Sequence, residues 1–197
     1  MSADAFLERV FAHLPVLRGG FEFSSWEQAG KATQEGVGVL KVPPVDVERV
    51  AARVMDVDHY TGNIAHVEEC RAIADKAWLP PKAVRFYQRI NVPMLSRIHH
   101  ELVLTDQGER NGWRVLAWHM LEAPTGALSS AQAARSAYSD GAWLIRPDAV
   151  GYALSSAPQR DDVGRLKFAA LTKGADAAAA KVVKANIEGM VAWARRG

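Results

Sequence analysis

Residues 97–104 read RIHHELVL and carry the side chains best suited to chemistry on a predicted strand of this sequence. Because side chains alternate between the two faces of a strand, His100 shares one face with aliphatic residues, whereas Arg97, His99 and Glu101 share the other. The apolar face is expected to line an interior, where His100 can hydrogen-bond the polar head of an apolar ligand. A core histidine that is satisfied by the protein itself is the simpler interpretation, since buried polar groups are nearly always paired.

The opposite orientation of this strand would turn Arg97, His99 and Glu101 inward as a charged network. Burying such a network is costly unless every charge is paired, and a β-bulge between Arg97 and His100 would mix the two faces. The sequence leaves both arrangements open, so Arg97 is a candidate ligand contact beside His100.

Residues 113–121 are apolar on both faces, which is typical of a strand with a cavity on one side and a helix on the other. Trp118 and Met120 are therefore candidate wall residues, although aromatic and methionine side chains also fill ordinary cores. Tyr87 and Tyr152 lie in other strand-like segments and carry hydroxyls that can reach a ligand. Ordinary core packing explains them equally well.

The last helical pattern places Asn186 and Gly189 one turn apart, on a flank of its apolar stripe. An amide there can contact a ligand, and a glycine either opens space or permits close helix packing. The predicted ligand-binding residues are His100, Arg97, Tyr87, Trp118, Met120, Tyr152 and Asn186.

Other polar groups give weaker signals. Asp56, Asp58 and His59 could hold a metal but lack a further well-spaced ligand, and residues 160–162, Arg-Asp-Asp, are interpreted as a solvated turn. Residues 36–38, GVG, lie inside a predicted strand before two prolines, so they do not form a phosphate loop. We predict no cofactor and no metal.

The elements that must position these residues begin with the segment 37–60. Its apolar period changes from that of a strand to that of an amphipathic helix, and Pro43 and Pro44 separate the two. Asp46 is placed to cap the helix, and Val50 and Val54 belong to an apolar stripe that needs a sheet to cover.

The remaining pattern consists mainly of strands with short connectors. A short helix is expected over 3–14, two extended stretches before the segment above, and a long helix over about 175–195. Residues 124–140 form a longer excursion that allows a short helix at 129–138. The strand-like segments after the first strand–helix unit are 65–74, 83–92, 97–106, 113–121, 141–146 and 149–157.

Composition excludes several classes of function. A chain of 197 residues suits one domain, and 24 basic against 22 acidic side chains, with no cluster of Lys or Arg among aromatics, argue against nucleic acid as a partner. Cys70 is the single cysteine, so no intramolecular disulfide is expected. The start has no signal-peptide core and no stretch of 18 apolar residues follows, so a cytoplasmic location is expected.

This layout resembles the START-like (SRPBCC) superfamily of lipid-transfer domains, polyketide cyclases and pollen allergens. The resemblance covers about residues 36–197, and residues 1–35 are expected to be an N-terminal helix and extension that pack on that domain. It implies an α+β helix-grip fold, in which a curved antiparallel sheet wraps a long C-terminal helix and encloses an apolar cavity. The phrases that carry it are GVGVLKVPPVDVERVAARVMDVDHY, RFYQRINVPMLSRIHHELVL, GAWLIRPDAVGYALSSAPQRDDVG and ANIEGMVAWARR.

The resemblance implies that the cavity binds a hydrophobic small molecule, such as a lipid, sterol, isoprenoid or polyketide-like compound, for transport or sequestration. The alternative is a polyketide cyclase or aromatase that closes rings on a poly-ketone in the same cavity. No acid and base pair is evident in the sequence, which favours binding over catalysis. Transient contact with a membrane is a further expectation, and the oligomeric state is open.

Overall fold

The computed structural model describes residues 3–92, 96–121, 133–166, 168–169 and 175–196. Eight strands form one open sheet in the order β1-β2-β8-β7-β6-β5-β4-β3. Strands that are neighbours in this order pair antiparallel, and a short parallel pairing also joins β5 to β7. The strands are β1 (Phe21–Trp26), β2 (Glu35–Lys41), β3 (Val67–Ile73), β4 (Ala83–Val92), β5 (Ser96–Arg110), β6 (Trp113–Met120), β7 (Ala134–Arg146) and β8 (Ala149–Pro158).

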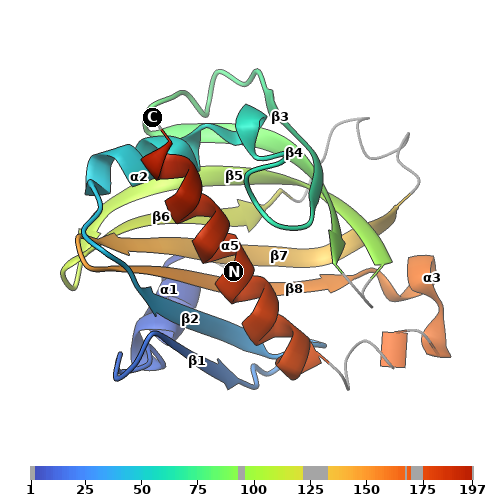
Figure 1. Ribbon diagram of the computed structural model, residues 1–197. Coiled ribbons are helices and arrows are strands. Elements are labelled where there is room, and N and C mark those ends of the chain that lie inside the picture. Colours follow the sequence, from blue (N-terminus) through green and yellow to red (C-terminus); the bar gives the residue numbers. More distant parts are fainter. Residues whose placement is uncertain (1–2, 93–95, 122–132, 167, 170–174, 197) are drawn as a thin grey trace.

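The long helix α5 (Ala175–Arg195) crosses the concave face of the curved sheet, as Figure 1 shows. Its predicted apolar stripe is buried, including Val183, Ile187 and Met190. Helix α2 (Val47–Met55) packs beside it, followed by a single 3-10 turn, η1 (Val57–His59). The expected helix-grip architecture is therefore confirmed.

Helix α2 forms where the change of period predicted it. The carboxylate of Asp46 accepts a hydrogen bond from the Arg49 backbone N–H at 3.2 Å, which caps the first turn. Val50, Ala51 and Val54 are buried against the inner face of the sheet. The proline corner between β2 and α2 thus turns an apolar stripe onto the sheet.

The other face of the sheet is covered by α1 (Ala3–Ala12), which lies behind β2 and β8 in Figure 1. Phe6, Leu7 and Val10 pack there on apolar side chains of β2, β6, β7 and β8. Arg9 also reaches the sheet, where its guanidinium makes two hydrogen bonds to the fully buried carboxylate of Glu35, at 2.7 and 2.8 Å. The extension 1–35 thus supplies an outer helix and, through β1, an edge strand paired with β2.

Two local predictions are wrong. The short helix allowed at 129–138 is contradicted from residue 134 onward, because β7 already runs there and pairs with β8 and briefly with β5; residues 129–132 lie outside the described part of the chain. Residues 160–162 are not a simple solvated turn, since they begin the one-turn helix α3 (Arg160–Val163). The Asp162 carboxylate accepts hydrogen bonds from the backbone and guanidinium of Arg135, which lower the pKa of Asp162 to about 2.

Gly189 is explained by close packing. A Cβ at this position would lie 2.4 Å from the backbone oxygen of Asn63, in the segment between η1 and β3. Only a residue without a side chain lets α5 approach that segment so closely. Gly189 therefore serves the close packing of α5 against this segment.

Candidate functional site

A cavity of about 140 Å³ lies between the concave face of the sheet and α5. It is far larger than the ~15 Å³ needed to hold one water molecule. Its wall is mainly aliphatic and aromatic, from β4, β5, β6, β7, β8 and α5, with a few polar groups between them. An apolar chamber with few polar groups is the usual form of a small-molecule site.

The predicted parity of β5 is correct. Ile98, His100, Leu102 and Leu104 line the cavity, whereas Arg97, His99 and Glu101 face away from it. His100 is 2% exposed, and its ring is held from both sides. Nδ1 lies 2.8 Å from the Ser136 hydroxyl, and Nε2 lies 3.1 Å from Oε1 of Gln88. Because an amide oxygen only accepts, Nε2 carries the proton and Nδ1 accepts from Ser136.

These contacts make His100 a neutral polar group. Burial, with a smaller contribution from neighbouring His99, lowers the pKa of His100 to about 3. A serine beside a histidine can form a nucleophile–base pair, but the base must be able to take up a proton near neutral pH. Here the ring faces an uncharged amide instead of a carboxylate, so the arrangement does not activate Ser136.

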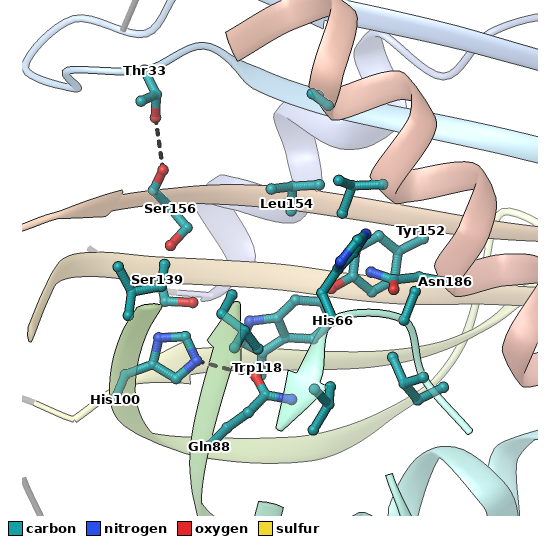
Figure 2. Close-up of a pocket in the computed structure, with 18 of the residues that line it drawn as sticks. Thr33, His66, Gln88, His100, Trp118, Ser139, Tyr152, Leu154, Ser156 and Asn186 are labelled. Carbon is teal, nitrogen blue, oxygen red and sulfur yellow. Dashed lines mark hydrogen bonds between the residues drawn. The ribbon is translucent and has the colours of Figure 1, made fainter. Parts of the chain in front are cut away.

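A second polar group combines Tyr152 from β8 with Asn186 from α5. Burial raises the pKa of the Tyr152 hydroxyl, and the neighbouring Asn186 amide lowers that pKa by a smaller amount. Oδ1 of Asn186 is buried without a hydrogen-bond partner. In Figure 2, Asn186 and Tyr152 lie together on one side of the cavity, while His100, Gln88 and Ser139 lie on the other.

Trp118 forms the floor between these two polar groups (Figure 2). The centroid of its ring lies 5.3 Å from that of the Tyr152 ring, and the Trp143 ring centroid lies 4.6 Å from that of Tyr152. Trp118 pairs across the sheet with Gly141 in β7. The absence of a side chain at Gly141 leaves the space that the indole occupies, because a Cβ there would lie 1.9 Å from Cζ2 of Trp118.

Of the seven predicted ligand contacts, the structure places four at the cavity: His100, Trp118, Tyr152 and Asn186. Arg97 lies on the outer face, where its guanidinium contacts Glu68 at 3.1 Å. Tyr87 is also outward, with the Arg71 guanidinium 5.0 Å above its ring. Met120 packs against the inner core but is not part of the cavity wall. Ligand contact stays a prediction for the four residues that line the cavity.

Sequence reasoning missed several polar wall residues, above all Gln88 and Ser156. Gln88 pairs directly with His100 across β4 and β5. Alternation in residues 85–90, RFYQRI, puts Gln88 with Phe86 and Ile90, and Tyr87 with two arginines, so the strand's own pattern could have shown which face lines the cavity. Ser156 follows Tyr152 and Leu154 on the cavity face of β8, and its hydroxyl has no hydrogen-bond partner.

Replacing His100 by phenylalanine is expected to lower the free energy of unfolding by about 1–3 kcal/mol, because Ser136 and Gln88 would lose a buried partner. Chemical denaturation of the purified variant measures this change. His100→Gln, which keeps polar atoms at the site, should lose less. Equal stability of H100F and the parent would show that these hydrogen bonds contribute nothing.

The weak metal candidate has a local explanation. His59 contacts Asp56 at 2.7 Å, whereas the Asp58 carboxylate turns away to accept the Ala72 backbone N–H. Within the described ranges, no three His, Cys, Asp or Glu residues cluster as a metal site would require. None of the helices there has both the length and the hydrophobicity to cross a bilayer.

Solved structures with the same fold include lipid-transfer proteins and a cyclase. Human STARD10 superposes with a TM-score of 0.71 at 13% identity, covering 100% of this chain and 83% of its own. A STAR-related lipid transfer protein fragment from Xanthomonas axonopodis gives 0.66 at 13% identity, covering 89% and 94%. The Zhui aromatase/cyclase from a Streptomyces species gives 0.54 at 13% identity, also covering 89% and 94%.

These similarities show that the chain has the START-like helix-grip fold. No protein-family model and no curated protein matches the sequence. At this level of identity the fold is shared, but the chemistry must be argued from the site.

Proposed function

We propose that this protein binds one hydrophobic small molecule, of the lipid, sterol, isoprenoid or polyketide-like class, between its sheet and α5, for transport or sequestration. The observation that carries the proposal is the apolar cavity itself, with polar groups placed between its aliphatic and aromatic wall residues. Each Å² of apolar ligand surface buried there contributes roughly 25 cal/mol to binding. The polar groups would then fix the orientation of the ligand.

Binding without catalysis is favoured over ring closure by the state of His100. A cyclase needs groups that accept and donate protons near neutral pH. His100, with its pKa lowered to about 3 and its ring held between Ser136 and Gln88, stays neutral and keeps its proton on Nε2. It is suited to hydrogen bonding more than to proton transfer.

Thermal unfolding with decan-1-ol as the probe tests the proposal. A ligand that binds only the folded protein stabilises it by about 2.7 kcal/mol at 100 times its Kd, so Tm should rise with probe concentration and native mass spectrometry should detect one bound molecule. Leu154→Trp, which fills the cavity from β8, is the control and should lose the shift. An equal shift in both proteins, or none in the parent, would contradict binding in this cavity.

A further inference from the structure

We propose that the ligand of this cavity is uncharged and carries a hydroxyl group that donates a hydrogen bond to Oδ1 of Asn186. This inference rests on the proposed binding function and narrows its ligand class. Alcohols with an apolar skeleton fit this description, whereas fatty-acid anions and phospholipids do not.

The first argument is the unpaired amide oxygen. Asn186 is 5% exposed and lines the cavity from α5. Its amide lies beside Tyr152 in Figure 2, and Oδ1 is buried with no hydrogen-bond partner. An unsatisfied buried acceptor costs about 1–3 kcal/mol, so a ligand that supplies a donor here recovers that free energy.

The donor requirement separates ligand classes. A ligand whose head group reaches Asn186 must supply a donor to Oδ1 or leave this acceptor unpaired. A hydroxyl can donate to Oδ1, whereas a ketone, an ester or a carboxylate can only accept.

The second argument is the lack of positive charge at the wall. Among the described residues that line the cavity there is no lysine or arginine. The arginines of β4 and the start of β5 lie on the outer face, bonded to acids: Arg85 to Asp75 and Glu101, and Arg89 and Arg97 to Glu68. A carboxylate or phosphate inside would be buried without compensation, at a cost of several kcal/mol.

The one acidic residue among the described wall residues does not change this balance. Glu35 shares the strand face of Val37 and Val39, and its carboxylate bonds to Arg9 and to Trp26 Nε1 on the outer side of the sheet. His100 is neutral because burial lowers its pKa. His66 is the other histidine of the described wall.

The length of the chamber guides the choice of probes. Tyr152 and Ser156 both face the cavity from β8, and four residues of strand span about 13 Å. Three probes with the same chain length but different head groups fit this span: decan-1-ol, decan-2-one and decanoate. They offer a donor, an acceptor without charge, and an anion.

The test is a competition among the three probes at pH 8. The protein is incubated with an equimolar mixture, separated from free probe by gel filtration and extracted, and each probe is quantified by gas chromatography. Decan-1-ol should be retained about tenfold over decan-2-one, the value of one well-made buried hydrogen bond, and more than a hundredfold over decanoate.

Asn186→Leu separates hydrogen bonding from apolar packing. It should bring the ratio of alcohol to ketone close to one without lowering ketone retention, whereas Val182→Ala, an apolar change on the same helix, should alter all three probes by one factor. Retention of decanoate equal to decan-1-ol, or an unchanged ratio in N186L, would overturn the inference while leaving the binding function intact. Retention of none of the probes by the parent would overturn the proposed function and this inference together.

Discussion

Replacing Arg9 by methionine is expected to lower the free energy of unfolding by about 3–5 kcal/mol at neutral pH, because it leaves a buried carboxylate without its partner. Glu35 is 0% exposed, and Arg9 makes two hydrogen bonds to it from the outer helix α1. Trp26 Nε1 donates a third at 3.0 Å. Without the guanidinium, the carboxylate keeps only part of this compensation.

The pH dependence of stability should change sign in this variant. Burial alone would raise the pKa of Glu35, but the hydrogen bonds from Arg9 outweigh burial, and the pKa of Glu35 is lowered in the folded parent protein. The ion pair therefore stabilises the parent fully at pH values above the pKa of Glu35 in the unfolded chain. This stabilisation is lost as the pH falls through the pKa of Glu35 in the folded protein. In R9M the burial of Glu35 is no longer offset by Arg9, so the pKa of Glu35 rises above its value in the unfolded chain. The variant should therefore regain stability as pH falls from 7 toward 5.

Denaturant titrations across this pH range measure both effects. The control is Arg110→Met, which breaks an exposed ion pair between Arg110 in β5 and Asp4 in α1, the helix that also carries Arg9. This substitution should lower the free energy of unfolding by less than about 1 kcal/mol. A loss in R9M as small as in the control, or one that does not depend on pH, would show that Glu35 is not held as a buried anion.

Gly141→Ala is expected to destabilise the protein by about 2–3 kcal/mol and to impair ligand binding, although it adds one methyl group. The new Cβ would lie 1.9 Å from Cζ2 and 2.4 Å from Cε2 of Trp118, so the indole must move. Overpacking of a filled interior costs roughly this amount. Since Trp118 is the floor of the cavity, its displacement reduces the space for a ligand.

Gly20→Ala is the matched control, because no atom lies within 4 Å of a Cβ built there. It should change stability by less than about 0.5 kcal/mol, as exposed substitutions usually do. Trp118→Phe should restore part of the stability of G141A by removing the colliding ring. Equal stability of G141A and G20A would contradict the packing of Trp118 over Gly141.

Local patterns predicted those elements whose apolar period is strong. The change of period at Pro43 located α2, the stripe through Ile187 located α5, and the alternation in β5 gave the inward face of His100. The overall architecture followed from these elements together with the family resemblance.

Contacts set by pairing between distant strands could not be predicted in the same way. Residues 134–138 became strand because β8 and β5 supply their partners, which overrides any local tendency to form a helix. The satisfaction of His100 depends on Ser136, 36 residues away, and on a register that no local pattern specifies. The unpaired oxygen of Asn186 likewise appears only when α5 lies against β8.

The measurement that tests the central claim most directly is a crystal structure of the protein grown with 10-bromodecan-1-ol, with bromine located by its anomalous scattering. The proposal predicts one strong peak inside the chamber on the side of His100 and Ser139, with the hydroxyl at Asn186. A peak only on the molecular surface, with the chamber filled by ordered water or by a displaced Trp118, would contradict it.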